Sequence, residues 1–377
     1  MKRAEGGILT MEKASLVIDN GTGYSKAGIC SEDMPKCVLR TKVGVPWSEL
    51  AFEADCQTVC PGRKTPCSNS IIWKAPIVHG VVVDWNLMEI FWKHIFFRVL
   101  KIDPGDHPVL LSESPASPLD NRELAAELLF EYFGFPAMHV APSCILSLYS
   151  CGRILGLVID VGDGTSLTCP VLEGFILPHA LYRLDIAGET LTRHLRELLS
   201  LSGKTFLIHE KSLVRKIKEK TCYVALDYQK ELQRDQYLDY QLPDGQVLSL
   251  AKERFQCPET LFQPNLLKVS EPGLHHMAFK SLQKVDSSAR MVIQKTILLC
   301  GGSSLFPGLP ERLQNELRLL LPKNSEFSFL VPDPKKRWYS AWLGGAIAAS
   351  LPTFHNLWVR KEEYKEKGSI YLHQKCY

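Results

Sequence analysis

Two short stretches of the chain combine an aspartate with closely spaced glycines directly after an apolar run, a combination suited to holding phosphate groups. The first is Leu16-Val17-Ile18-Asp19-Asn20-Gly21-Thr22-Gly23, and the second runs from Gly156 to Thr168 and contains Asp160-Val161-Gly162-Asp163-Gly164. Glycines in such turns let backbone N–H groups approach an anion, and a carboxylate there can hold a hydrated divalent cation. A single copy is usually a plain turn. Two copies favour a duplicated architecture in which one hairpin from each half closes on nucleotide phosphate.

The residues around these motifs predict the strands that carry them. Residues 157–159 are expected to form a strand covered on both faces, and Asp163-Gly164 is a strong signal for a two-residue hairpin. The first strand is expected at about 15–20, after a leader at 1–14 that offers no chemistry. Residues 296–304 predict a strand that runs into a third glycine loop, where paired glycines would admit a flat base or ribose.

Helices are expected wherever apolar residues recur at helical spacing. Phe91, Ile95 and Leu100 indicate a heavily buried helix, and Leu124, Leu128 and Tyr132 form the apolar positions of the next one. The predicted helices span 87–100, about 121–133, 142–149, 191–201, 213–223 and 341–351, with a short strand at 108–111 and a hairpin at 242–247.

Two segments stand out by composition instead of periodicity. Residues 44–70 are irregular and contain several prolines, which predicts a small exposed insertion that contacts partners. The helix at 213–223 carries Arg215, Lys216, Lys218 and Lys220, and a charge run of this kind is, on its own, typical of a solvated face.

The bulk composition excludes several classes of protein. The chain has 377 residues, 45% apolar and 23% charged, which is typical of a globular protein and predicts two domains. A net charge of +3 falls short of a dedicated nucleic-acid binder. No apolar run predicts a membrane span or a signal peptide. The 12 cysteines lack zinc-site spacing, even where Cys56, Cys60 and Cys67 come near one another, and scattered reduced thiols are expected.

Several further sequence blocks follow one another along the chain. These blocks are Ala75-Pro76-Ile77-Val78-His79-Gly80, His107-Pro108-Val109-Leu110-Leu111, Lys218-Glu219-Lys220 with Cys222 to Asp227, Leu242 to Val247, Arg254-Phe255-Gln256-Cys257-Pro258-Glu259 and Lys375-Cys376-Tyr377. With the two hairpins, they resemble the actin and actin-related protein family across nearly its whole length. Sugar kinases and Hsp70-type chaperones share the two-hairpin plan, but these blocks argue against both.

The resemblance implies the family's actin-like two-domain α/β fold: duplicated RNase H-like halves, with four subdomains in all, around a nucleotide cleft. The first half would comprise 1–150 and 340–377 with a small insertion at 41–76, and the second would comprise 151–339 with a small subdomain at 187–269. The halves would meet near 143–151 and 337–345.

The resemblance also implies that the cleft holds ATP or ADP with Mg²⁺ or Ca²⁺. Asp19 and Asp160 would orient the cation through water. The first two hairpins would hold phosphates, the basic helix would approach the ribose and base, and the third loop would line the adenine side. The implied nucleotide-binding residues are Gly21, Thr22, Gly23, Tyr24, Lys26, Gly162, Asp163, Gly164, Thr165, Arg215, Lys218, Glu219, Gly302, Ser303 and Ser304.

Two residues depart from the family pattern where an attacking water would be aligned. Ser143 stands where a glutamine is typical, and Leu167 stands where a histidine typically follows the second hairpin. Serine is too short for the same gap, and leucine neither accepts nor relays a proton. We therefore expect nucleotide binding with slow or absent hydrolysis, at most a weak ATPase, and assign no catalytic residue. Because Asp19 and Asp160 are intact, an active ATPase that forms actin-like filaments is the alternative.

Other departures concern assembly and the base. The segment at 44–70 lacks the hydrophobic DNase-binding loop of conventional actin, and Lys268 enters a region that is normally an apolar plug. Both weaken the expectation of ordinary filaments. The acidic N-terminus that conventional actins offer to myosin is also missing and is replaced by Lys2, Arg3 and Lys13. At the adenine side, Arg337-Trp338-Tyr339 stands where a lysine-tyrosine pair is usual, so Trp338 would either stack on adenine or fill the core.

Four apolar residues match the groove through which this family binds partner proteins: Tyr149, Ile347, Leu351 and Leu357. A helix-in-groove partner is one interpretation, and core packing explains the same residues equally well.

We expect a cytoskeletal, actin-related protein of the cytoplasm that uses bound nucleotide structurally and acts through cytoskeletal or actin-binding partners and self-association. Its divergence resembles the testis-type actin-related and actin-like proteins, which extends the hypothesis to spermatogenesis and the sperm-head cytoskeleton. Direct nucleic-acid binding is not expected. The alternative of a nuclear subunit of a chromatin-remodelling complex rests on Lys335-Lys336-Arg337 alone.

Overall fold

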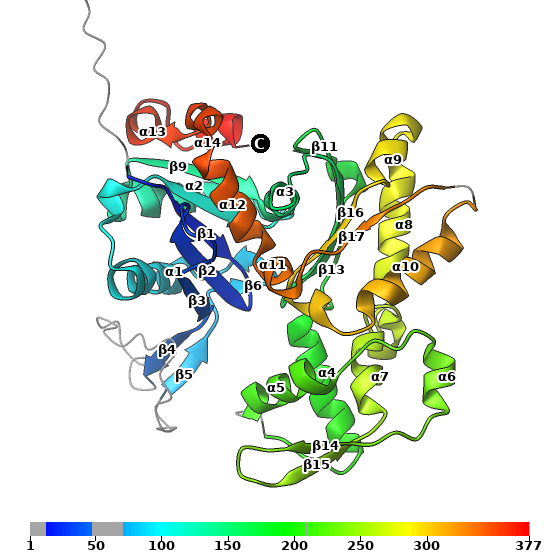
Figure 1. The fold of residues 1–377 in the computed structure, drawn as a ribbon. Helices are drawn as coiled ribbons and strands as arrows, with labels where there is room; N and C mark the ends of the chain where they lie inside the picture. The colour runs from blue at the N-terminus through cyan, green and yellow to red at the C-terminus, as the bar shows by residue number, and fades with distance from the viewer. Residues whose placement is uncertain (1–12, 47–70, 208–209, 324, 377) are drawn as a thin grey trace, which may run out of the picture. The chain divides into compact units, whose positions relative to one another are not determined.

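The structure, a computed structural model, describes residues 13–46, 71–207, 210–323 and 325–376. The chain divides into two compact units (Figure 1). Unit 1 comprises Met1–Asn20, Tyr24–Ser150 and Ala341–Tyr377, and unit 2 comprises Gly21–Gly23 and Cys151–Ser340. Most of the predicted leader and most of the insertion expected at 44–70 lie outside the described residues.

Unit 1 is built on a six-stranded sheet with the order β18-β9-β8-β1-β2-β3. The strand that carries Asp19, β1, pairs parallel with β8 and antiparallel with β2. Leu16, Val17 and Ile18 are all almost fully buried, which explains why β1 is a continuous apolar run. The strands are β1 Leu16–Asn20, β2 Tyr24–Ile29, β3 Cys37–Arg40, β8 Val109–Glu113, β9 Ala137–Pro142 and β18 Val359–Arg360, with two small sheets formed by β4 Val43–Pro46 and β5 Ile71–Lys74, and by β6 Ile77–Val78 and β7 Val81–Val82.

The helix predicted at 87–100 is confirmed, although it changes character midway. Helix α1, Trp85–Lys93, begins at Asp84, whose side chain accepts a hydrogen bond from the Leu87 amide, and it continues as a wider π-helix over His94–Leu100. Phe91, Ile95 and Leu100 are buried as expected.

The apolar face expected for the next helix is wrong. Helix α2, Asp120–Glu127, also widens into a π-helix, over Leu128–Tyr132. Leu124 and Tyr132 are 40% and 50% exposed, whereas Ala125, Leu129 and Phe130 are buried. A second apolar set at helical spacing therefore faces the core, and the wider turn shifts the phase of the residues that follow it.

Helices α3 and α12 of unit 1 cross closely at a glycine of α12. Helix α12, Ser340–Ser350, crosses α3, Ser143–Tyr149, so closely that a Cβ on Gly344 would lie 1.6 Å from the Leu146 carbonyl oxygen. The buried Trp342 of α12 donates to the Val17 carbonyl at 3.2 Å, which fixes α12 on β1. Two short helices follow, α13 Lys361–Lys367 and α14 Tyr371–Lys375.

Unit 2 repeats the central arrangement of unit 1. Its strand β10, which carries Asp160, pairs antiparallel with β11 and parallel with β16, in the sheet order β12-β11-β10-β16-β17. The second hairpin and the strand before the third glycine loop thus form as predicted. The strands are β10 Gly156–Val161, β11 Ser166–Leu172, β12 Phe175–Ile176, β13 Tyr182–Leu184, β16 Ile297–Cys300 and β17 Phe329–Leu330.

Eight helices of unit 2 lie within the described residues, and those predicted at 191–201 and 213–223 are confirmed as α4 and α5. The hairpin predicted at 242–247 is also present, between β14 Leu238–Gln241 and β15 Val247–Leu250. The helices are α4 Gly188–Leu201, α5 Lys211–Thr221, α6 Tyr228–Leu232, α7 Glu253–Glu259, α8 Leu274–Lys284, α9 Ser287–Ile293, α10 Leu309–Leu320 and α11 Pro334–Trp338 (Figure 1).

Candidate functional site

In unit 1, Asp19 is held by two side chains at the carboxyl end of β1. It is 7% exposed and accepts from Ser112 Oγ at 2.6 Å and from Lys26 Nζ at 2.8 Å. Sequence reasoning missed Ser112, although it follows the apolar run of β8 just as Asp19 follows that of β1. The predicted phosphate-binding Lys26 therefore faces the predicted cation-binding Asp19, and each fixes the other's position. Tyr24, the third predicted residue of unit 1, lies under the Arg40 guanidinium, 4.7 Å from its ring centroid.

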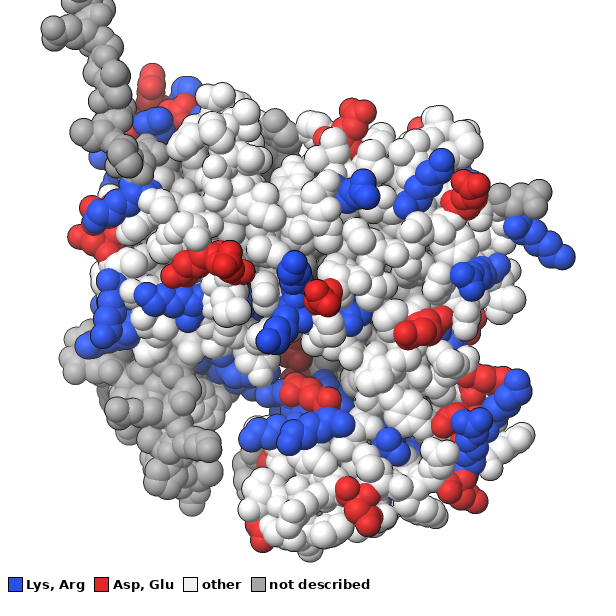
Figure 2. Space-filling model, in the orientation of Figure 1, with Lys and Arg blue, Asp and Glu red and all other residues white. Residues whose placement is uncertain are grey.

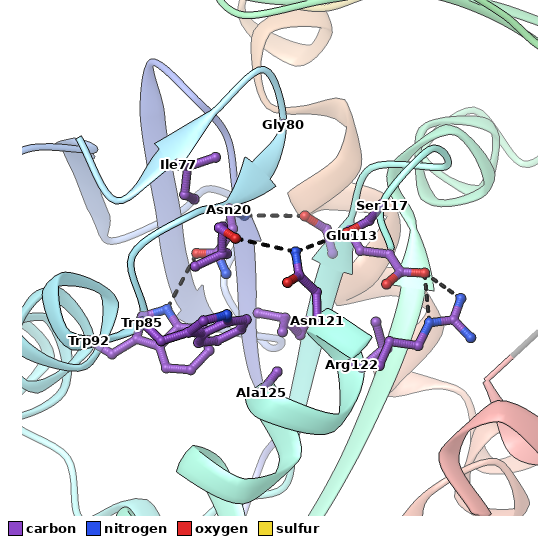
Figure 3. A pocket seen from close by; sticks show the side chains of 14 residues that line it. Asn20, Ile77, Gly80, Trp85, Trp92, Glu113, Ser117, Asn121, Arg122 and Ala125 are labelled. Atoms are coloured by element: carbon purple, nitrogen blue, oxygen red, sulfur yellow. Dashed lines mark hydrogen bonds and ion pairs between the residues drawn. The ribbon is translucent and has the colours of Figure 1, made fainter. Parts of the chain in front are cut away.

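A small pocket in unit 1, lined by Asn20 among other residues, lies between Trp85 and Trp92 on one side and Ser117 and Asn121 on the other (Figure 3). The Asn20 side-chain oxygen accepts from Trp92 Nε1 at 3.4 Å. The cavity of about 30 Å³ has room for about two water molecules. It is too small for a nucleotide.

In unit 2, the glycines of the two aspartate-glycine turns allow those turns to meet at close range. A Cβ on Gly23 would lie 2.6 Å from the Asp163 side chain, and a Cβ on Gly164 would lie 2.5 Å from Thr22 Oγ1. No side chain fits at either position without a shift of its neighbour. The predicted residues 21–23 and 162–165 are thereby brought together.

The amino terminus of α4 is tied to the same turn. Gly188 N donates to Gly162 O at 3.1 Å, Glu189 N donates to Asp163 O at 2.8 Å, and Lys218 Nζ donates to Gly188 O. Burial lowers the pKa of Lys218, and the nearby Asp163 carboxylate partly opposes that shift. The first turn of a helix carries partial positive charge, so it adds to the field of the lysine.

The basic helix α5 is therefore not a uniformly solvated face. Lys218 and Arg215 are 4% and 9% exposed, while Lys216, Glu219 and Lys220 are exposed. Arg215 faces Glu189 at 3.9 Å. Of the three predicted residues on this helix, Lys218 bonds to Gly188 at the start of α4, Arg215 lies next to the first turn of α4, and Glu219 is exposed.

The third glycine loop joins the site through Ser303, whose hydroxyl donates to Gly162 O at 2.7 Å. Gly301 has φ 89° and packs against Asp160, since a Cβ there would lie 2.3 Å from Asp160 Oδ1. Ser304 is fully buried and donates to Gly301 O at 2.6 Å, so its role is to hold the loop. The carboxyl ends of β10 and β16 thus present Asp160, Gly162 and Ser303 at one edge of the sheet.

Leu167 lies directly opposite Asp160 in the antiparallel pairing of β10 with β11. Directly opposed residues project from the same face of a sheet, so a buried isobutyl group, 4% exposed, lies beside the Asp160 carboxylate. Ser143 begins α3 in unit 1 and is partly buried. Neither side chain can act as a proton acceptor at neutral pH.

The four residues predicted for a partner groove all belong to unit 1. Ile347, on α12, and Leu351, the residue after this helix, are 41% and 49% exposed, whereas Tyr149, at the end of α3, and Leu357 are partly buried. The close crossing at Gly344 and Leu146 brings the two helices together near Tyr149 and Ile347.

The basic stretch at 335–337 is divided by the fold. Lys335 and Lys336 are exposed, but Arg337 is 6% exposed.

On the visible face in Figure 2, positive and negative side chains are interspersed, with no broad basic field among the coloured residues. None of the helices in the described ranges is long and apolar enough to cross a membrane. The nine cysteines that the structure describes form no disulfide.

The donors in these turns suit a nucleotide phosphate. Glycines at contact distance, hydroxyls of Thr22 and Ser303, and the ammonium group of Lys218 are groups that proteins use around polyphosphates. Over the described residues, no cluster of three His, Cys, Asp or Glu side chains gathers around a common point. A cation held mainly by phosphate oxygens and water, with one or two carboxylates nearby, needs no such cluster.

Comparison with known families agrees with this arrangement. The Actin family model matches residues 10–212 and 204–377, which together span nearly the whole chain. Actin-family proteins typically bind a nucleotide with a divalent cation and are generally cytoskeletal. The predicted actin-like α/β fold is confirmed, and this chain belongs to the actin family.

Proposed function

We propose that this protein binds ATP or ADP with Mg²⁺ or Ca²⁺, hydrolyses it slowly or not at all, and acts as a structural member of a cytoskeletal assembly. The observation that carries the first part is the meeting of two glycine turns with the buried Lys218 and the first turn of α4 in unit 2. Backbone N–H groups and Lys218 would hold phosphate oxygens, and the carboxylates of Asp19 and Asp160 would orient water on the cation. The bound cation would supply charge neutralisation between phosphates.

Slow hydrolysis is inferred from the chemistry of Leu167 and Ser143, the two residues that depart from the family pattern. The buried Leu167 opposite Asp160 offers no lone pair, and Ser143 is too short to reach a distant water. Without a side chain that aligns the attacking water, binding the nucleotide contributes little to its cleavage. The nucleotide would then serve as a lasting structural ligand.

A gain-of-function variant tests this point. Purified protein would be loaded with γ-labelled ATP, and bound nucleotide and released phosphate would be followed over hours. We expect retained ATP in the unmodified chain and about tenfold or faster phosphate release in the Ser143→Gln/Leu167→His double variant. Leu319→His is the matched control, because Leu319 is 82% exposed on α10. Turnover in the unmodified chain equal to that of the double variant would establish the active-ATPase alternative instead.

We further propose that the groove formed by Tyr149, Ile347, Leu351 and Leu357 receives a helix of a partner protein. Ile347→Asp/Leu351→Asp should abolish capture of amphipathic actin-binding peptides, whereas Leu319→Asp should not. Equal binding by both variants would remove the groove from the proposal.

The cellular setting proposed is the cytoplasmic cytoskeleton, and specifically that of the sperm head. The burial of Arg337 weakens the basic stretch as a nuclear targeting signal in the folded chain, because only Lys335 and Lys336 remain exposed. Tissue expression and the location of a tagged full-length chain test this assignment. A nuclear signal together with chromatin-remodelling subunits would favour the nuclear alternative.

A further inference from the structure

The indole of Trp338 lies at the edge of the third glycine loop. Trp338 is the last residue of α11, is partly exposed, and packs edge-on against Gly302. A Cβ on Gly302 would lie 3.2 Å from the indole Cδ1 and 3.4 Å from Nε1. The ring edge therefore rests on the glycine backbone, and a planar ligand does not fit between them. A ligand bound at this loop would therefore lie beside the indole and not between the indole and Gly302.

The backbone next to the indole is held by the residue before it, Arg337. The neighbouring Arg337 is 6% exposed, and its carbonyl oxygen accepts from Gly301 N at 3.3 Å. This bond ties α11 to the loop at the residue before the indole. Because an aromatic side chain has only two rotatable bonds, a ring anchored in this way loses little entropy when a ligand stacks on it.

The indole of Trp338 lies at the same edge of the unit 2 sheet as the glycine turn at 162–165. Strands β10 and β16 run parallel, with Asp160 opposite Cys300, so their carboxyl ends lead into the turn at 162–165 and the loop at 301–304. Ser303 joins the two through its 2.7 Å bond to Gly162 O. Ligands of parallel α/β sheets bind outside the carboxyl ends of the strands. An aromatic ring next to a phosphate site at that edge is suited to stack a nucleobase.

We propose that Trp338 determines how this protein recognises the base of its nucleotide, by stacking on a purine. The inference rests on the nucleotide binding proposed above and adds the residue and the physical basis of base recognition. Stacking alone does not read the hydrogen-bonding edge of a base, because every base has a π face. Trp338 therefore contributes equally to the affinity for ATP and for GTP, and contributes nothing to the affinity for a polyphosphate without a base.

Equilibrium binding to the full-length chain, with Mg²⁺ present, tests the proposal with three ligands: ATP, GTP and inorganic tripolyphosphate. Trp338→Ala should weaken ATP and GTP by the same factor, about 5- to 150-fold, and leave tripolyphosphate unchanged. Trp338→Phe should retain most of the affinity. Trp73→Ala is the matched control, because Trp73 is a 45% exposed indole in unit 1. Nucleotide-dependent quenching of tryptophan fluorescence should disappear in Trp338→Phe and persist in Trp73→Ala.

The outcomes separate this inference from the one on which it rests. If the unmodified chain binds tripolyphosphate as tightly as ATP, or if Trp338→Ala leaves ATP affinity unchanged or tightens it, the stacking role is wrong while phosphate binding stands. If Trp338→Ala weakens tripolyphosphate as well, the indole supports the loop and does not contact the base. If the unmodified chain binds none of the three ligands, the proposed function fails together with this inference.

Discussion

Replacing Gly164 by alanine tests the central geometric feature, the contact between the two aspartate-glycine turns in unit 2. The new methyl group would lie 2.5 Å from Thr22 Oγ1 and 2.9 Å from both its Cβ and its Cγ2. Threonine is β-branched and has few side-chain rotamers, so rotation about one bond cannot remove all three contacts. The two turns must therefore move apart.

The expected cost follows from overpacking. Inserting one methyl group into a well-packed site typically costs about 1–3 kcal/mol. If the structure is retained and the turns separate, this cost falls on the bound state, and nucleotide affinity should drop by about 5- to 150-fold. The effect should be partly reversed in the Gly164→Ala/Thr22→Gly double variant, because the second change removes all three contacting side-chain atoms. A coupling free energy of about 1 kcal/mol or more is expected between the two positions.

The assay is a double-mutant cycle with ATP affinity and urea unfolding measured for each variant. Gly105→Ala is the control, because the nearest atom to a Cβ there lies 3.5 Å away, an ordinary contact. Unchanged affinity and stability in Gly164→Ala would show that the turns do not meet. Additive effects of the two substitutions would refute the steric explanation even if the single variant is impaired.

Three further predictions concern ionisable groups. Arg312→Met should lower the free energy of unfolding, measured by urea titration, by about 3–5 kcal/mol. The reason is that the Glu259 carboxylate, which is 0% exposed, loses the Arg312 guanidinium that lies 3.2 Å from it. A loss below about 1 kcal/mol would contradict this prediction. Burial lowers the pKa of His139 from 6.5 to about 4, so the unfolded chain takes up the proton first as the pH falls below 6.5. About 2 kcal/mol should then be lost between about pH 7 and pH 5, and His139→Asn should remove that part of the pH dependence; an unchanged slope would exclude His139 as its source. Hydrogen bonds from His373 and Ser369 lower the pKa of Glu123 below 4.5. This link between α2 and α14 should therefore hold at neutral pH and weaken in acid below that value. Hydrogen exchange in α14 that is the same in Glu123→Gln and in the unmodified chain would argue against the link.

Several elements were predictable because their signals are local. The strands at 16–20 and 156–161 are short apolar runs that end at turn residues, and the Asp163-Gly164 pair specifies the hairpin between β10 and β11. The helices at 188–201 and 211–221 follow from apolar spacing. The face of α2 was not predictable in this way. Two apolar sets have similar spacing there, and the π-turn after Glu127 changes which set faces the core.

For the candidate site, too, only part could be predicted from the sequence. The sequence shows that Asp19 and Asp160 are present and that Leu167 and Ser143 depart from the family pattern, which predicts nucleotide binding without efficient hydrolysis. The sequence also determined family membership, because many short blocks occur in a fixed order along one chain.

Only the tertiary structure decided which of these residues meet. The pairing of Asp19 with Ser112 joins residues 93 positions apart, and the contact of Lys218 with Gly188 joins residues 30 positions apart. The same basic helix buries Lys218 and exposes Lys216, and the same basic stretch exposes Lys335 and buries Arg337. Local sequence patterns encode the period and the ends of an element. Which face is buried, and which distant side chain it meets, depends on the packing of whole elements against one another.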